Sequence, residues 1–382
     1  MTARDFVIEN ASLVLPDRVV EHGWLAVAGG RIAELGEGKA PERAEDFGGD
    51  HLLPGFVELH TDHLESHYAP RPRVRWDAFS AALAYDAQIA ASGITTVFDS
   101  LRVGSDADSG SLGSEIWTLA DAIAAACAGG HMRAEHRTHL RCEVSSPDVV
   151  DQAEEYVSRY RAHLISLMDH TPGQRQFRSL ATWRAFYSRK TPLTEAELDR
   201  FVEVRLDLHA RFAAAHRRRL VEIAHANGIA LASHDDSSEE HVREAVEDRV
   251  SLAEFPTTLE AARASHAAGI SVMAGGPNVV RGGSHSGNVA AHDLAREGIL
   301  DVLSSDYVPA SLALAAFSLP GRVPGIDLAD AVRTVTLNPA RATGLDDRGA
   351  LAAGLRADLV RIHLFDRRPV VRSVWREGRR VA

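Results

Sequence analysis

The stretch LPGFVELHTDHLESH, Leu53–His67, joins a short apolar run to a cluster of metal-binding residue types. Its first half, Leu53–Leu59, opens with a Pro-Gly pair and predicts a buried strand. His60 and Asp62 follow at a spacing of two, which places both side chains on the same side of an extended chain. Histidine and carboxylate ligands together suit Zn²⁺ or a similar divalent ion. A polar loop after a strand is the alternative, and for any single histidine it is the better interpretation.

The composition limits the classes of function. The chain has 382 residues, 45% of them hydrophobic, and a formal net charge of −11. That charge argues against general nucleic-acid or anionic-membrane binding, so an anionic substrate would need specific arginines or metal ions. Cys127 and Cys142 are the only cysteines, which excludes a disulfide framework and a cysteine-based zinc site and fits a reducing cytoplasm. No signal peptide or membrane span is expected, and assembly into a homo-oligomer stays open.

The middle of the chain alternates between apolar segments and helical patterns. Eight strands separated by helices are typical of an α/β fold of the (β/α)₈ barrel type. The predicted strands are Leu53–Leu59, Gly93–Ser100, Arg133–Val144, His163–Met168, Gly228–Ser233, Val250–Phe255, Gly269–Ala274 and Ile299–Ser305. The clearest predicted helices are Asp77–Ser92, Ser114–Gly129, Ser237–Glu247 and Thr257–Ala268.

The two ends of the chain have a different residue pattern from the middle. Short alternating segments broken by glycine, asparagine and proline in 1–52 and 346–382 predict one small β-sandwich domain formed by both termini. The barrel domain would then span 53–345. It would contain a helical insertion at about 182–227, which could be a lid, an oligomer contact or a long αα-hairpin.

Barrel enzymes carry their functional groups at the carboxyl ends of the strands, and candidate ligands follow several of the predicted strands. We expect two divalent ions held by His60, Asp62, His170 and His234 and bridged by Glu143. Such ions lower the pKa of a bound water to about 7, and Asp306 after the last strand could accept its proton and also contact the metal. A helix N-cap is the alternative role for Asp306. The histidines on helices are expected to have no ligand role: His209, His216, His225, His241 and His266.

The glycine-rich segment Gly275–Asn288 follows the seventh predicted strand. Its glycines let the backbone approach a ligand closely, and its polar side chains could donate to oxyanions. Further arginines fall beside the ends of the first and fourth strands. The candidate substrate-binding residues are Arg71, Arg73, Arg175, Arg281, Ser284, His285 and Asn288. Ordinary turns and solvated surface arginines are the alternative.

Two motifs resemble the amidohydrolase superfamily: the opening LPGFVELH-x-D and the segment NPARATGLDDRGALAAGLRADLV. More narrowly, the phosphonate-pathway branch is similar in HTDHLE, PRPRVRW, SGITTVFD, RAEHRTHLRCE, SLMDHTPGQRQF, ASHDD, AEFPTT, PNVVRGGSHSGN and LSSDYVPASL. These motifs span Leu53 to Val360. The resemblance implies a hydrolase with two Zn²⁺, or Mn²⁺ or Fe²⁺, that acts on a small anionic phosphorylated sugar. It would cleave the 5-triphosphate of a ribose 1-methylphosphonate to the 5-phosphate and pyrophosphate.

The chain departs from the superfamily pattern in three places. Asp62 stands where the wider superfamily has a second histidine, as in the phosphonate branch. His63 stands where that branch has asparagine, and it could contact phosphate, bind another metal or face the rim. The superfamily scheme also places Glu143 and His170 one strand later, which would need another strand before Arg133. Hydrolysis of a C–N bond, by a cyclic amidase or deaminase, is the nearest alternative function, and a metal-free scaffold of the same fold is a further one.

Overall fold

The computed structural model describes residues 5–105, 115–177, 179–190, 194–284 and 287–382, and at 182, 186 and 188–190 it describes the backbone alone. The chain divides into two compact units. The first contains Met1–Asp99, Asp121–Arg137 and Ala274–Ala382, and the second contains Ser100–Ala120 and Thr138–Met273. These units do not follow the two sheets, so domain boundaries at 52/53 and 345/346 stay a prediction.

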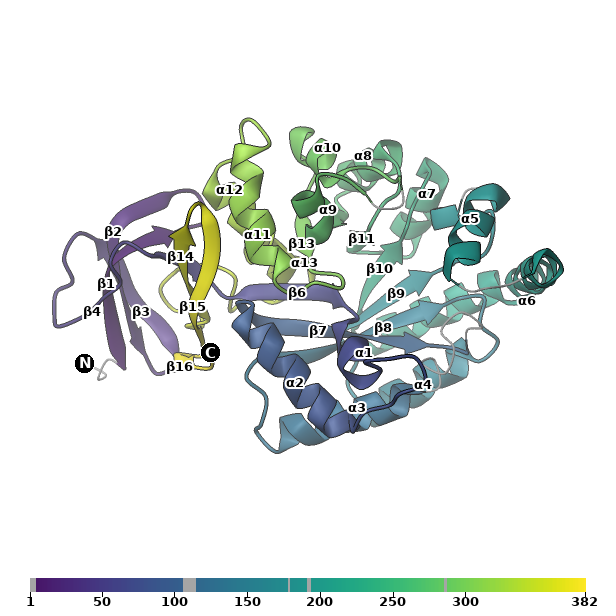
Figure 1. The fold of residues 1–382 in the computed structure, drawn as a ribbon, viewed down its shortest axis with the longest axis horizontal. Helices are drawn as coiled ribbons and strands as arrows, with labels where there is room; N and C mark the ends of the chain where they lie inside the picture. Colours follow the sequence, from purple (N-terminus) through teal and green to yellow (C-terminus); the bar gives the residue numbers. More distant parts are fainter. Residues whose placement is uncertain (1–4, 106–114, 178, 191–193, 285–286) are drawn as a thin grey trace. The chain divides into compact units, whose positions relative to one another are not determined.

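Both ends of the chain contribute strands to one sheet, which lies in the first unit (Figure 1). Its strands are β1 (Phe6–Val14), β2 (Val19–Ala28), β3 (Arg31–Glu37), β4 (Glu45–Asp46), β5 (His51–Pro54), β14 (Leu359–Phe365), β15 (Arg368–Arg376) and β16 (Arg379–Arg380). The join is made by β5, which pairs with β1 on one side and runs antiparallel to β14 on the other. The expected separate β structure built from both termini is confirmed.

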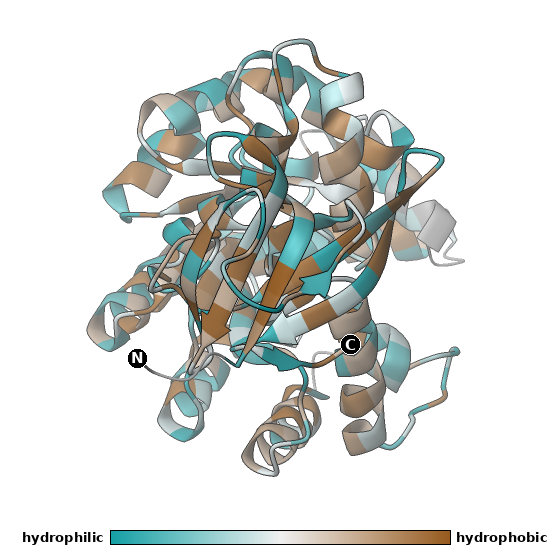
Figure 2. Cartoon of the chain, turned by 90° about the vertical axis from the view of Figure 1, so that its left-hand side faces the viewer, coloured by the Kyte–Doolittle hydropathy of each residue, from teal (hydrophilic) through white to brown (hydrophobic). Residues whose placement is uncertain are grey.

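The core of this sheet consists of apolar residues from its strands and from the segments between them. Side chains such as Ile8, Leu25 and Leu359 are fully buried, and the Phe47 and Trp375 rings stack with centroids 6.1 Å apart. In Figure 2 the strands of this sheet carry hydrophobic and hydrophilic residues in turn. Residues from both faces of β1 and β2 are buried, in two separate apolar clusters.

The second sheet has eight strands in the order β13-β12-β11-β10-β9-β8-β7-β6. Its strands are β6 (Phe56–Thr61), β7 (Ile94–Val103), β8 (Glu135–Glu143), β9 (Leu164–Met168), β10 (Ala230–His234), β11 (Leu252–Glu254), β12 (Ser271–Gly275) and β13 (Val302–Ser304). Neighbours such as β9 and β10 pair in parallel. Thr61, the last residue of β6, forms a parallel bridge with Asp306, which follows β13, and this bridge closes the sheet. The (β/α)₈ barrel is confirmed.

Each of the eight predicted strands corresponds to one strand of this sheet. In the described residues between β7 and β8, which are 104–105 and 115–134, α3 is the regular element and no further strand is present. The extra strand suggested by the superfamily scheme therefore has no counterpart there.

Helices alternate with these strands. They are α1 (His63–Tyr68), α2 (Ala78–Ala91), α3 (Ile116–Ala128), α4 (Val149–Arg159), α5 (Leu180–Lys190), α6 (Glu195–Asn227), α7 (Glu239–Glu247), α8 (Leu259–Ala267), α9 (Gly276–Arg281), α10 (Ala291–Arg296), α11 (Ser311–Ser318), α12 (Leu328–Arg333) and α13 (Leu337–Ala342), with 3₁₀ turns at Arg175–Phe177 and Leu319–Gly321. Side-chain caps begin several of them, for example Asp77, which accepts from the Ser80 amide at the start of α2. None of the helices in the described ranges is long and apolar enough to cross a bilayer.

The predicted helical insertion consists of α5 and the 33-residue helix α6, both in the second unit. A capping box between Thr194 and Glu197 begins α6, and Gly228 ends it in the left-handed conformation. The Trp183 ring of α5 lies 5.3 Å from the Phe201 ring of α6. Of the three forms that the sequence left open, the αα-hairpin describes this packing.

Candidate metal centre

Strand β6 ends in the first unit at two of the predicted ligands. His60 is buried within the strand, and the half-buried Asp62 follows as the residue before α1. Between them, the Thr61 hydroxyl donates a hydrogen bond of 2.7 Å to the Asp306 carbonyl oxygen. The structure therefore places residues 60–62 and Asp306 at the paired ends of β6 and β13.

Asp306 has an unusual backbone conformation. Its φ is +55°, in the left-handed region that residues other than glycine seldom adopt and that is frequent at functional sites. The next helix, α11, has Ala310 as its N-cap residue. The alternative role of Asp306 as the cap of that helix is therefore excluded.

Glu58 lies in β6, two residues before His60, and was not among the predicted site residues. Its fully buried carboxylate accepts from the His60 amide at 2.7 Å, the Ser304 hydroxyl at 2.9 Å and the Ser305 amide at 2.5 Å. Burial raises its pKa to about 7. The signal in the sequence was a glutamate inside the otherwise apolar FVEL. Glu58 therefore links β6 by hydrogen bonds to the end of β13, next to His60.

His63 belongs to a small group on the first two helices. Its Nε2 and the Nε2 of His67 each lie 3.1 Å from the side-chain oxygen of Gln88 on α2. Because that oxygen only accepts, both nitrogens act as donors in this arrangement. Phosphate contact, binding of another metal and a place at the rim stay the three alternatives for His63.

The second unit holds Glu143 at the end of β8 and His170 just after β9. The Glu143 Oε2 lies 2.7 Å from His170 Nδ1, and its Oε1 accepts from the His170 amide at 3.2 Å. Burial alone lowers the pKa of His170, but the Glu143 carboxylate outweighs it and raises that pKa above its usual value. Glu143 thus fixes the orientation of the His170 ring.

A ligand cluster forms in this unit around His170. His170, His234 and Asp235 each offer one ligand atom, and these three atoms lie within 4.8 Å of one another. The His170 and His234 rings are 5.8 Å apart. Nitrogen and oxygen donors in such a group suit a divalent cation such as Zn²⁺. Asp235 was not predicted as a ligand, although it is the first acidic residue of ASHDD.

Two further buried residues of the second unit can bind a cation. His139 of β8 and Glu254 of β11 are fully buried, with His139 Nε2 3.7 Å from Glu254 Oε1. The Ser166 hydroxyl donates to the other oxygen of Glu254 over 2.6 Å. His139 could have been found from its spacing, because it is four residues before Glu143 and period two puts both on the same face of β8.

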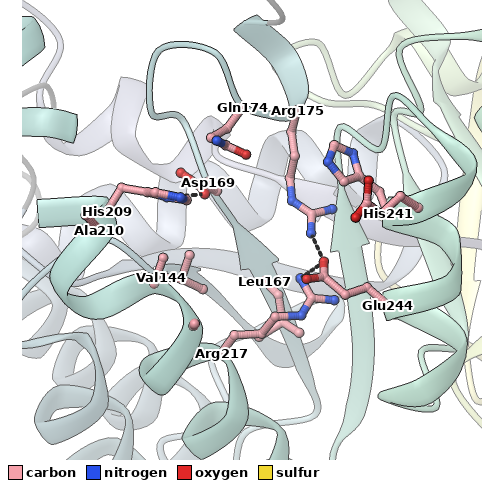
Figure 3. A pocket seen from close by; sticks show the side chains of 13 residues that line it. Val144, Leu167, Asp169, Gln174, Arg175, His209, Ala210, Arg217, His241 and Glu244 are labelled. Atoms are coloured by element: carbon pink, nitrogen blue, oxygen red, sulfur yellow. Dashed lines mark hydrogen bonds and ion pairs between the residues drawn. The ribbon is translucent and has the colours of Figure 1, made fainter. Parts of the chain in front are cut away.

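Arg175 is buried and lines a cavity of about 400 Å³ in the second unit (Figure 3). Its guanidinium bonds the carboxylate of Asp236 and also that of Glu244, the latter over 2.6 Å. Glu244 in turn pairs with Arg217 at 3.3 Å. A substrate-binding role for Arg175 stays a prediction.

The remaining candidates for phosphate binding lie in the first unit. Arg71, Arg73 and Arg281 are exposed, and Ser284 and Asn288 are half-buried. The first part of the glycine-rich segment forms α9, and the Arg322 guanidinium donates to the Val279 carbonyl oxygen in this helix over 2.7 Å. His285 lies outside the described residues.

Comparisons with known proteins identify what the chain is similar to. The model of the "Amidohydrolase family" matches residues 131–382. The alpha-D-ribose 1-methylphosphonate 5-triphosphate diphosphatase of Escherichia coli (strain K12) is 46% identical over 378 residues, which are 98% of this chain and 100% of that protein. An imidazolonepropionase of Deinococcus deserti is 41% identical over 92 residues, 22% of this chain and 21% of that protein.

Among solved structures, N-acetyl-D-glucosamine-6-phosphate deacetylase from Mycobacterium smegmatis aligns with a TM-score of 0.66 at 17% identity. The alignment covers 99% of this chain and 100% of that one. At this identity the likeness supports the fold.

Proposed function

The chain belongs to the amidohydrolase family, and we propose that it hydrolyses alpha-D-ribose 1-methylphosphonate 5-triphosphate to the 5-phosphate and pyrophosphate. The observation that carries this proposal is the 46% identity to the Escherichia coli diphosphatase over 98% of the chain. The motifs of that branch are spread along the barrel, so the likeness includes the ends of the strands, where barrel enzymes carry their chemistry.

The residues present fit a divalent metal centre. The half-buried His170 and the buried His234 and Asp235 form a group of nitrogen and oxygen donors with ligand atoms within 4.8 Å of one another. We propose two ions, Zn²⁺ first and Mn²⁺ or Fe²⁺ as alternatives, with ligands from His60, Asp62, Glu143, His170, His234, Asp235 and Asp306. When bound, such ions polarise phosphoryl oxygens and lower the pKa of a coordinated water.

The side chains of the protein have two tasks in this reaction. In this proposal Asp306 accepts a proton from the attacking water. Two observations support the role: its carbonyl oxygen accepts from the Thr61 hydroxyl at the end of β6, and Asp306 is only half-buried. The exposed Arg71, Arg73 and Arg281 would neutralise the triphosphate, since the net charge of −11 makes the overall field unfavourable for an anion. Positioning and charge neutralisation supply most of the catalysis in phosphoryl transfer.

A substrate panel tests the proposal. The metal-loaded protein is expected to release pyrophosphate from the ribose 1-methylphosphonate 5-triphosphate much faster than from nucleoside triphosphates. Arg281→Ala should raise KM for the triphosphate more than KM for a neutral ester. Equal effects on both substrates would remove Arg281 from the phosphate site.

Hydrolysis of a C–N bond is the second candidate. It is favoured by the match to an imidazolonepropionase, although that match covers 22% of the chain. The same panel with cyclic amides and aminated heterocycles separates the two functions, because ammonia or a new carboxylate would appear in place of pyrophosphate.

A further inference from the structure

We propose that helix α6 positions the metal-ligand loop after β9 through His209, which holds Asp169 beside the ligand His170. His209 is then a positioning residue, and it gives the helical insertion a task in the reaction. The inference rests on the proposed function only where turnover is measured. Its metal-binding part concerns the second unit alone.

The first observation is the contact itself. His209 Nδ1 lies 2.9 Å from Asp169 Oδ2, with 7% of the Asp169 side chain and 29% of the His209 side chain exposed. The other oxygen of Asp169 accepts from the Thr171 amide at 3.1 Å. One oxygen of the carboxylate thus contacts the His209 imidazole of α6, and the other accepts a hydrogen bond from the residue after His170. A buried carboxylate that lost the imidazole would lack a charged partner, which is costly.

The second observation is that three different elements contact the loop after β9. Glu143 of β8 bonds the His170 ring, and the Trp183 indole of α5 donates to the His170 carbonyl oxygen over 3.3 Å. His209 of α6 adds the third connection through Asp169. Figure 3 shows the His209 and Asp169 side chains pointing toward one another beside the cavity.

The third observation is the length of α6. The helix ends at Asn227, and β10 begins at Ala230. His209 lies about 27 Å back along a helix that rises 1.5 Å per residue. A five-residue strand such as β9 spans only about 17 Å. The distance from the C-terminal end of α6 back to His209 is therefore longer than a barrel strand. This length carries His209 to the level of the loops that hold the proposed ligands.

The α6 helix also reaches the next ligand loop. Arg217 of α6 pairs with Glu244 of α7, and Glu244 shares Arg175 with Asp236. Asp236 is two residues after His234 and accepts from the Ser233 hydroxyl at 2.5 Å. Both loops that carry the ligands of the second unit are thus connected to one helix.

Three variants at one position test the proposal. In His209→Asn the amide nitrogen takes the place of Nδ1, in His209→Gln it falls nearer the place of Nε2, and in His209→Leu the donor is lost. Arg211→Ala is the control, because it removes an exposed ion pair with Asp207 from the same helix. Each full-length protein is assayed for Zn²⁺ affinity by competition with a chromogenic chelator, for melting temperature, and for kcat and KM.

His209→Leu is expected to bind Zn²⁺ about 10- to 100-fold more weakly, the usual cost of losing a group that orients a ligand. Its kcat should fall while KM changes little. His209→Asn should recover most of the affinity, His209→Gln less, and Arg211→Ala should match the wild type. Wild-type affinity in His209→Leu, equal losses in the Leu and Asn variants, or an equal loss in Arg211→Ala would overturn the proposal.

The proposed function fails separately. A wild-type protein that binds Zn²⁺ but does not cleave the triphosphate contradicts the function, while the chelator competition still decides the role of His209. A wild-type protein that takes up no divalent ion would overturn both.

Discussion

The candidate metal ligands at the end of β6 and those after β9 are held in different ways. At β6, the support comes from the last strand of the same barrel, because Glu58 and Thr61 bond directly to residues 304–306. After β9, much of the support comes from side chains of the inserted hairpin, Trp183 and His209. The β6 arrangement is part of the barrel itself, so damage there should cost stability. The β9 arrangement lies on an addition to the barrel, so damage there should cost metal affinity first.

The largest expected effect is at Asp306. Asp306→Asn keeps the shape of the side chain but removes its ability to accept a proton, so kcat should fall by roughly 10²- to 10⁴-fold, the range of general-base catalysis. Metal content should stay close to that of the wild type, because the other six proposed ligands remain and the asparagine amide oxygen can still contact the metal. Both are measured on the same preparation, by elemental analysis and by pyrophosphate release. Full turnover in the variant would refute the base assignment.

The next largest effect is a loss of protein stability when the support at the end of β6 is removed. Glu58→Ala leaves the His60 and Ser305 amides without their buried acceptor, which should lower the free energy of unfolding by roughly 2–5 kcal/mol. Glu58→Gln retains one acceptor oxygen and should lose less. Urea denaturation of the metal-free proteins measures both. A Glu58→Ala protein as stable as the wild type would show that the connection between β6 and β13 is not needed.

A pH series compares two histidine–carboxylate contacts. His136 of β8 lies fully buried between Asp86 and Asp99, with nitrogen–oxygen distances of 3.2 and 2.9 Å. Burial lowers the pKa of His136, but the two carboxylates outweigh it and raise that pKa from 6.5 to about 9. The stabilisation is therefore complete below pH 6.5 and is lost as the pH rises to about 9. Its size is on the order of 3 kcal/mol.

The measurement is the difference in unfolding free energy between the wild type and His136→Gln from pH 6 to pH 10. It should shrink across this range, because the variant has no titrating group at this position. At His209 the pKa is raised mainly by the contact with a single carboxylate, that of Asp169, and the imidazole is only partly buried, so wild type and His209→Asn should differ less over the same series. A difference for His136 that does not change with pH would contradict the charged state.

The smallest expected effect is at Trp183. Trp183→Phe keeps an aromatic ring in the α5–α6 cluster but removes the donor to the His170 carbonyl oxygen, a hydrogen bond of about 1 kcal/mol. Zn²⁺ affinity should fall roughly fivefold by the same reasoning, with little change in melting temperature. Trp117→Phe is the matched control, because Trp117 of α3 stacks on Tyr156 in the same unit. Equal losses in both variants would show a general packing effect.

The elements of the barrel could be predicted from the sequence because local rules decide them. Apolar runs bounded by glycine predict strands such as Leu164–Met168, and capping residues such as Asp77 mark helix starts. The residues after the strands could be found for the same reason, since parallel strands of a barrel present their ends on one side. His170 and His234, predicted separately, do lie together with Asp235.

The residues that sequence analysis missed lie where a local pattern does not show which distant residues the side chain contacts. Glu58, His139 and Glu254 are polar residues inside apolar strands, and their contacts are made with residues of neighbouring strands. Glu58 accepts from a buried serine, and Glu254 contacts both a buried serine and His139. His209 was set aside as a helix histidine, because a helical pattern does not say which loop lies opposite. The contact with Asp169 joins residues 40 positions apart, and it depends on the packing of α6.

The most direct test of the account is ³¹P NMR of the products formed from alpha-D-ribose 1-methylphosphonate 5-triphosphate by chelator-stripped protein before and after reloading with Zn²⁺. The account predicts that the stripped protein is inactive and that the reloaded protein forms pyrophosphate and the 5-phosphate in equal amounts. Orthophosphate as the first product, or equal rates with and without the metal, would contradict it.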